Sequence, residues 1–371
     1  MIKVFTVFGT RPEAIKMAPL VLELERTEGI ESIVCVTAQH RQMLDQVLEI
    51  FGITPDYDLD IMRERQSLAG ITKRALEGIC EVLEKEKPDI VLVHGDTTTT
   101  FAGALAAFYS GVQVGHVEAG LRTYDKWSPF PEEMNRRMTG VLADLHFSPT
   151  TANRENLLRE GTPEGKIVIT GNTVIDALKT TVKKNYEFSD PVLRSLPWKD
   201  KRVILMTAHR RENLGEPMYN IMRAVRRIAD EFSDVEVVYP VHLNPAVQSV
   251  AREILGEVEN VHLINPLDVQ ELHNAMNASY IILTDSGGLQ EEAPSLGKPV
   301  LVLRTETERP EAVEAGTVKV VGVDEDVIYA ETKKLLCCRE EYEKMAKAVN
   351  PYGDGHASKR IVQAILEHFA K

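Results

Sequence analysis

The sequence lacks the features of several protein classes. Its four cysteines are Cys35, Cys80, Cys337 and Cys338, and no Cys-x-x-Cys spacing suited to zinc occurs among them. Cys35 and Cys80 stand in apolar contexts that are typical of inert core thiols. No apolar run approaches the roughly 18 residues that a membrane span needs. The segment after Met1 passes directly into a strand pattern and has no signal-peptide cleavage region, so we expect a cytoplasmic protein that does not bind membranes.

The chain also has fewer positively charged than negatively charged residues. The chain has 43 Lys and Arg against 56 Asp and Glu, which gives a net charge of −13 at pH 7. A broad surface for nucleic acid or an anionic membrane is therefore not expected, and any phosphate site must be a local basic pocket. The Walker A order, the nucleophile elbow Gly-x-Ser-x-Gly and the metal motif His-Glu-x-x-His are absent as well.

What the sequence does contain is a series of short apolar runs rich in Val and Ile, separated by helix-length amphipathic segments. A chain of 371 residues is too long for one compact core. Strands this apolar, at this spacing, are typical of parallel sheets covered on both faces. Six runs fall in each half, which predicts two doubly wound domains. The predicted strands are residues 2–8, 32–37, 89–93, 112–117, 144–147, 167–170, 202–207, 235–241, 261–264, 280–284, 299–303 and 317–321.

The predicted fold class is thus α/β, with two Rossmann-like domains. We place the first domain at residues 1–170 and the second at residues 171–355, with the change of domain near Gly171. The last helix lies in the segment 356–371. By analogy with other two-domain folds of this kind, we expect that helix to pack back on the first domain.

One turn in the second half predicts an anion site. Ser286, Gly287 and Gly288 lie between the strand predicted at 280–284 and a helix. Backbone N–H groups in such a turn, with the positive end of the helix dipole, bind anions, and glycine permits close approach. An acid pair one helical turn later and the charged loop 304–311 suggest a nucleotide diphosphate bound through phosphate and ribose. A glycine-rich turn that serves only tight packing is the alternative.

Polar residues also follow the strands of the first half, where open α/β sheets bind ligands. Arg11 and Lys16 follow the first strand, Asp96 follows the third, Glu118 ends the fourth, and Glu132 opens a helix. A solvated helix start, a helix N-cap and the general preference of acids for helix N-termini are the simpler explanations. Together, however, three carboxylates near one sheet edge are suited to proton transfer.

Two histidines follow strands of the second half. His209 comes after the strand predicted at 202–207, and His242 follows the next strand. A histidine at such a position can donate to phosphate or act as an acid–base group, and a structural loop histidine is the alternative. The two halves thus divide the chemistry: acids in the first and anion donors in the second.

In this order, these motifs resemble the non-hydrolysing UDP-N-acetylglucosamine 2-epimerases of bacteria. The resemblance implies a GT-B-like fold, with two Rossmann-like domains facing across a cleft, and no metal or redox cofactor. It also implies reversible conversion of UDP-GlcNAc to UDP-ManNAc by elimination of UDP to an enzyme-bound 2-acetamidoglucal and re-addition, which supplies ManNAc for cell-envelope polysaccharide. The matching blocks are residues 9–16, 94–97, 116–122, 131–133, 207–213, 285–288 and 308–311.

The resemblance further implies roles for individual residues. The proton-handling acids and the histidine beside the diphosphate match Asp96, Glu118, Glu132 and His209. The substrate-cleft cations, the phosphate cradle, the ribose-binding acid and the diphosphate-side arginine match Arg11, Lys16, Ser286, Gly287, Gly288, Glu292 and Arg309. A second UDP-GlcNAc site, through which family members are activated, matches Gln39, Gln42, Arg65, Arg210 and His242. A homodimer is expected from the same resemblance. Where the family usually has an aromatic residue against uracil, this chain has Leu272.

Three other functions are compatible with parts of this pattern. A GT-B glycosyltransferase would also bind a nucleotide sugar between two such domains, but three acids around the sugar are more than it requires. A hydrolysing epimerase usually carries a fused kinase domain, for which this chain has no room. A non-catalytic nucleotide-sugar sensor would not need the acids or His209.

Overall fold

The computed structural model describes residues 1–38, 41–63 and 66–370. It divides into two compact units: Met1–Thr180 together with the chain from Tyr352 onward, and Thr181–Pro351. The division falls later than the position near Gly171 that the sequence predicts. The reason lies in backbone contacts, because Asn172 N–H donates to the Tyr352 carbonyl over 2.7 Å and Asp176 accepts from the N–H groups of Ala357 and Ser358.

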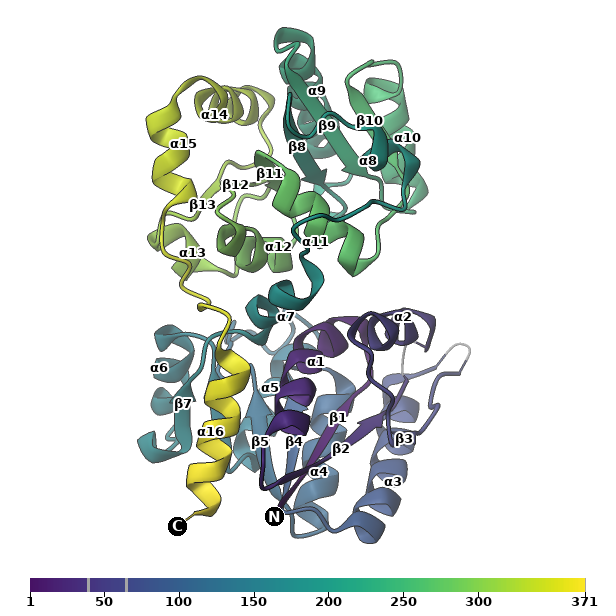
Figure 1. The fold of residues 1–371 in the computed structure, drawn as a ribbon, viewed down its shortest axis with the longest axis vertical. Coiled ribbons are helices and arrows are strands. Elements are labelled where there is room, and N and C mark those ends of the chain that lie inside the picture. Colours follow the sequence, from purple (N-terminus) through teal and green to yellow (C-terminus); the bar gives the residue numbers. More distant parts are fainter. Residues whose placement is uncertain (39–40, 64–65, 371) are drawn as a thin grey trace. The chain divides into compact units, whose positions relative to one another are not determined.

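The first unit contains a parallel sheet whose strands alternate with helices (Figure 1). Its strands are β1 (Ile2–Phe8), β2 (Ile30–Val36), β3 (Tyr57–Asp58), β4 (Ile90–His94), β5 (Gln113–Val117), β6 (Leu145–Ser148) and β7 (Ile167–Ile169). Its helices are α1 (Arg11–Arg26), α2 (Arg41–Phe51), α3 (Leu68–Glu86), α4 (Thr98–Tyr109), α5 (Glu132–Leu142), α6 (Thr151–Arg159), α7 (Thr173–Thr181) and α16 (Ala357–Phe369). The strand order is β3-β2-β1-β4-β5-β6-β7, so the direction of winding reverses between β1 and β4.

The second unit repeats the same plan. Its strands are β8 (Arg202–Thr207), β9 (Val235–Pro240), β10 (Val261–Ile264), β11 (Ile281–Thr284), β12 (Val300–Val302) and β13 (Val318–Val320). Its helices are α8 (Pro191–Ser195), α9 (Glu216–Glu231), α10 (Pro245–Leu255), α11 (Val269–Ala278), α12 (Gly287–Glu292), α13 (Pro310–Glu314), α14 (Glu325–Cys337) and α15 (Arg339–Ala346). The order β10-β9-β8-β11-β12-β13 reverses between β8 and β11.

The predicted α/β class with two Rossmann-like sheets is confirmed. Every strand pair in both sheets is parallel, and helices flank the strands, which is why most strand residues are apolar. The strand missed by the sequence pattern is β3, which pairs with the end of β2 through Tyr57 and Asp58 alone. Two residues are too few to give an apolar period.

Helix α16 packs on the first unit. It lies beside α1, where the yellow helix is drawn in Figure 1, and buries Ile361, Val362 and Ile365. At its far end, the imidazole of His368 pairs with the side-chain oxygen of Gln113 at the start of β5, 2.7 Å away. None of the helices in the described part of the chain combines the length and hydropathy of a bilayer-spanning segment.

Candidate active site

The first site loop joins β1 to α1 and is held by a buried carboxylate. Glu13, which is 2% exposed, accepts the backbone N–H groups of Gly9 and Thr10 on one oxygen, over 3.1 and 2.8 Å. Its other oxygen accepts the hydroxyls of Thr97 and Thr100 at the start of α4, over 2.7 and 3.2 Å. One carboxylate therefore ties the loop after β1 to the loop after β4, and it sits one turn ahead of Lys16.

Glu118 is the centre of the first unit's polar cluster. It follows β5 and has a left-handed backbone conformation (φ 62°), which residues other than glycine rarely adopt. Its carboxylate contacts Lys16 Nζ, accepts from Asn172 Nδ2 over 2.9 Å and lies 3.6 Å from His94 Nε2. Burial raises the pKa of Glu118, but the charge of Lys16 and the neighbouring His94 outweigh it and hold the pKa well below its usual range. Glu118 is therefore ionised at neutral pH.

His116 stabilises the turn before Asp96 through a hydrogen bond to the backbone. Gly95 has a left-handed backbone (φ 67°), and its carbonyl accepts from His116 Nε2 over 2.7 Å. Burial lowers the pKa of His116 to about 3, so the ring is neutral and its single N–H is directed to this carbonyl. A neutral imidazole here fixes the backbone that presents Asp96 without adding a charge beside it.

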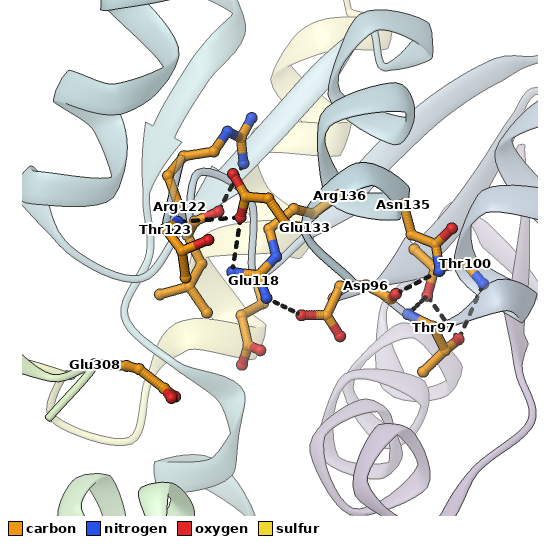
Figure 2. Close-up of polar contacts among 12 residues, drawn as sticks. Asp96, Thr97, Thr100, Glu118, Arg122, Thr123, Glu133, Asn135, Arg136 and Glu308 are labelled. Carbon is orange, nitrogen blue, oxygen red and sulfur yellow. Dashed lines mark hydrogen bonds and ion pairs between the residues drawn. The ribbon is translucent and has the colours of Figure 1, made fainter. Parts of the chain in front are cut away.

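Asp96 belongs to a chain of charges that runs into the interior. Arg136 Nη2 lies 2.7 Å from one Asp96 oxygen, and Arg136 Nη1 lies 3.6 Å from Glu133, as Figure 2 shows. Glu133 in turn accepts the backbone N–H groups of Thr123 and Tyr124 over 3.0 and 3.1 Å. The Asp96 side chain is 28% exposed and that of Arg136 only 6%, so Asp96 is the end of the chain that a ligand can reach.

Glu132 and Glu133 are adjacent on α5 but have different surroundings. Glu133 is fully buried in the charge chain just described, whereas Glu132 is half-buried. Among the described residues, no hydrogen bond or ion pair to the Glu132 side chain is present. Of the two acids, Glu132 thus keeps a carboxylate that is not committed to the fold, while Glu133 is a structural acid.

The second unit has a buried carboxylate of its own, Asp285, just after β11. One oxygen accepts the N–H groups of His209 and Arg210 and the amide of Asn213, over 2.7, 2.8 and 3.1 Å. The other oxygen lies 3.3 Å from His209 Nδ1. The ring of His242 stacks on that of His209, with centroids 5.3 Å apart and planes 10° from parallel. Two predicted histidines and the loop after β8 are therefore assembled around one acid.

The predicted anion turn carries two guanidinium groups. Ser286 precedes α12, and a Cβ placed on Gly287 would lie 3.7 Å from Arg309 Nη2 and 3.9 Å from Arg210 Nη2. Glu291, which is buried, contacts Arg309 Nε and so orients that guanidinium. The start of α12 thus combines backbone N–H groups with two cations, an arrangement suited to a diphosphate.

Glu292 and the loop before α13 are also anchored. Glu292 lies 3.1 Å from His273 Nε2, and Glu292 Oε1 lies 3.1 Å from the Cβ position of Gly288. Buried Gln290 donates to the Ser286 carbonyl over 3.2 Å and accepts from the hydroxyl of Thr307. The anion turn and the loop that carries Arg309 are therefore joined by hydrogen bonds.

The residues predicted for a second nucleotide-sugar site are distributed between the units. Gln42 is exposed on α2 of the first unit, and Arg210 and His242 belong to the histidine cluster of the second. Gln39 and Arg65 lie outside the described residues. Arg11, predicted as a substrate-cleft cation, begins α1 and is half-buried.

Sequence reasoning missed three acids, one cation and one amide that hold the site together. These residues are Glu13, Glu133, Arg136, Asn172 and Asp285. The available signal was position, because Glu13, Glu133 and Asp285 all lie within the motif blocks. Position alone does not distinguish an acid that faces the ligand from one that accepts backbone N–H groups.

Two Rossmann-like sheets of this order, with carboxylates at the edge of one and an anion turn at the edge of the other, define a GT-B-like α/β protein. A family model described as UDP-N-acetylglucosamine 2-epimerase matches residues 22–366. The UDP-N-acetylglucosamine 2-epimerase of Bacillus subtilis is 63% identical over 368 residues, which are 99% of this chain and 96% of that protein. The chain therefore belongs to the UDP-N-acetylglucosamine 2-epimerase family.

Solved structures agree with this assignment. The UDP-GlcNAc 2-epimerase of Neisseria meningitidis bound to UDP-GlcNAc superposes with a TM-score of 0.88 and is 53% identical, covering 99% of this chain and all of that one. The Methanocaldococcus jannaschii enzyme in complex with UDP-GlcNAc and UDP has a TM-score of 0.78 and 34% identity, with the same coverage. The likeness extends over the full length of both units.

Proposed function

We propose that this chain catalyses the reversible epimerisation of UDP-GlcNAc and UDP-ManNAc at C2 of the sugar. The observation that carries the proposal is the full-length match to epimerases, one of which is bound to UDP-GlcNAc. The carboxylates at the edge of the first sheet and the cations at the anion turn of the second supply the groups this reaction needs. ManNAc made in this way would feed cell-envelope polysaccharide.

The reaction proceeds by elimination and re-addition. A carboxylate removes the C2 proton while the bond from C1 to the UDP oxygen breaks, which leaves UDP and 2-acetamidoglucal with a double bond between C1 and C2. UDP then adds back to C1, and a proton is delivered to the opposite face of C2. We assign these proton transfers to Asp96, Glu118 and Glu132. The low pKa of Glu118 favours its carboxylate form, which is the form a base requires.

The departing diphosphate requires cations and hydrogen-bond donors that hold it for the return step. We assign this work to the turn of Ser286, Gly287 and Gly288, to Arg309 and to His209, with Glu292 on the ribose. The position of the Arg309 guanidinium, 3.7 Å from a Cβ placed on Gly287, supports this assignment. Arg11 and Lys16 are assigned to the sugar side of the site, and the contact of Lys16 with Glu118 supports this placement.

The proposal includes activation by a second UDP-GlcNAc molecule and a homodimer. Gln39, Gln42, Arg65, Arg210 and His242 are the residues assigned to the activating site. We expect turnover of UDP-ManNAc alone to rise when UDP-GlcNAc is added, by a factor of about 5 to 150, which is the usual range of allosteric coupling. A rate independent of added UDP-GlcNAc would contradict the activating site. The molecular mass in solution tests whether the protein is a homodimer.

One experiment tests the reaction itself. The protein is incubated with UDP-GlcNAc in D₂O and the products are followed by NMR. The proposal predicts UDP-ManNAc, with deuterium entering at C2 of both epimers. Free ManNAc with UDP would point to hydrolysis, and an unchanged substrate would favour a transferase or a sensor. A GT-B glycosyltransferase remains the second candidate because the same fold would bind a UDP-sugar donor; its sign is sugar transfer to an added acceptor.

A further inference from the structure

The candidate mechanism gives no role to the buried acid Asp285. Asp285 is 0% exposed, and Asp285 N–H donates to the Thr207 carbonyl over 3.1 Å. Its Oδ2 is saturated by the N–H groups of His209 and Arg210 and by the amide of Asn213. A carboxylate held by so many donors has a fixed orientation. The direction of its second oxygen is therefore set by the fold.

That second oxygen faces an imidazole. Asp285 Oδ1 is buried and has no hydrogen-bond partner among the described residues, while His209 Nδ1 lies 3.3 Å away. An unpaired, buried carboxylate oxygen is costly, and a short movement of the ring would turn this contact into a charge-assisted hydrogen bond. Catalytic hydrogen bonds of this type often tighten only when the ligand is bound.

The loop around His209 restrains the ring. The hydroxyl of Tyr239 donates to the Ala208 carbonyl over 2.7 Å, and the ring of His242 stacks on one face of the His209 ring. With Nδ1 turned to Asp285, the ring has one nitrogen left for a ligand, Nε2. The side chain of His209 is 37% exposed, so the ring is accessible to solvent.

We propose that Asp285 is the positioning residue of His209, which it holds with the proton on Nδ1 so that Nε2 donates to the departing diphosphate only as an imidazolium. This inference rests on the proposed function of His209. It assigns Asp285 a task in the reaction without contact to substrate. It also explains why an acid is buried under a site whose task is to bind an anion.

The charges around the ring are consistent with this role. Burial lowers the pKa of His209 and the Asp285 carboxylate raises it, while His242 and Arg210 lower it again, so the net direction is downward. Asp285 is the group that favours the cation against the others. Removing its charge should therefore reduce the fraction of His209 that is protonated at neutral pH.

Asp285→Asn is the informative substitution because it is isosteric. The amide oxygen of Asn can keep the three N–H donors, which turns its NH₂ group toward His209 Nδ1. That nitrogen must then accept, so the neutral ring carries its proton on Nε2. The change of tautomer needs no change of backbone.

The test uses ¹⁵N-histidine NMR on the full-length protein, with His209→Gln to identify the signal among the ten histidines. Above the pKa of His209 we expect the Nδ1–H tautomer in the unsubstituted protein and the Nε2–H tautomer in Asp285→Asn. Asp176→Asn is the matched control, since Asp176 is also buried and accepts two backbone N–H groups. An Nε2–H tautomer in the unsubstituted protein overturns the proposal, even if Asp285→Asn does not fold.

Kinetics add a second, independent readout. For Asp285→Asn we expect kcat/KM to fall about tenfold at pH values where His209 of the unsubstituted protein is protonated, because a charge-assisted hydrogen bond becomes a neutral one. The unsubstituted protein should lose activity as pH rises through the lowered pKa of His209, and this loss should be absent from Asp285→Asn. A pH profile parallel to that of the unsubstituted protein would overturn the proposal. If the unsubstituted protein lacks epimerase activity, the proposed function fails, while the NMR spectra still decide the tautomer.

Discussion

The carboxylates of the two units differ in their surroundings and in the groups that they contact. In the first unit, Glu118 contacts Lys16 and Asp96 contacts Arg136, and both acids keep an edge toward solvent. In the second unit, Asp285 and Glu291 are buried, and each holds a group of opposite character: His209 for Asp285 and Arg309 for Glu291. The same fold thus presents acids in one unit and presents cations, supported by acids, in the other.

This difference gives a rule for interpreting acids in such sites. We expect an acid that meets the ligand to remain partly exposed and to accept no backbone N–H group, as is the case for Asp96 and Glu132. An acid that accepts backbone N–H groups, like Glu13 or Glu133, belongs to the framework.

The largest effect is expected at Asp96. Asp96→Asn keeps the shape and the hydrogen bond to Arg136 but removes the group that can take a proton. We expect kcat to fall at least about a hundredfold, measured as UDP-ManNAc formed and as deuterium entering C2 in D₂O. Asp45→Asn, at an exposed position on α2, is the control and should leave kcat unchanged. Near-normal turnover of Asp96→Asn would remove this acid from the mechanism.

A smaller effect is expected for the cation of the second unit. Arg309→Lys keeps the charge but loses the planar fork that Glu291 orients and that a diphosphate can engage through two bonds. We expect the Kd for UDP to rise about tenfold, or about 1.4 kcal/mol, by isothermal titration calorimetry. Arg339→Lys, at a 90% exposed position, should bind UDP as the unsubstituted protein does. Equal affinities for both variants would contradict the assigned role of Arg309.

The pairing of Lys16 with Glu118 predicts a shift in pH dependence. Lys16 holds the pKa of Glu118 down, so Lys16→Gln should raise that pKa. Activity that depends on ionised Glu118 is present above its pKa and lost below it, so the acidic limb of kcat/KM should move to higher pH. Activity at pH 8 should fall less than activity at pH 5. Lys73→Gln, on the exposed face of α3, is the control. If the acidic limb of Lys16→Gln did not move, Lys16 would not set the pKa of the group that controls activity.

The smallest effect is expected at Leu272, which is half-buried on α11. An aromatic ring there could stack on uracil, which is worth about 0.5–1.5 kcal/mol. Leu272→Phe should therefore tighten UDP binding by about 2-fold to 13-fold, with ADP as the comparison within the same protein. A similar gain for both nucleotides would mean that the ring stacks on the base without selecting uracil, and no gain for UDP would mean that the side chain does not contact the base.

Much of the fold could be predicted from the sequence because buried parallel strands have a strong apolar signal. The strands around β1, β8 and β11, and the turn after β11, follow from composition and glycine placement. The short strand β3 has too few residues for such a signal. Its pairing depends on where the end of β2 lies, which is a tertiary contact.

The site was harder to predict for a different reason. Glu132 and Glu133 are neighbours on one helix, so their side chains point about 100° apart, and only packing decides which faces inward. Packing buries Glu133 and leaves Glu132 half-exposed. The role of Asp285 depends in the same way on the path of the loop after β8, which places three donors around one oxygen.

The way α16 completes the first unit has a consequence for synthesis on the ribosome. The first unit needs Asp176 to meet the N–H groups of Ala357 and Ser358, whereas the second unit is the continuous segment Thr181–Pro351 with its own core. All residues of the second unit are therefore synthesised before the first unit has the segment that it needs to fold completely. The apolar face of α1 that α16 covers therefore stays uncovered until α16 has been synthesised.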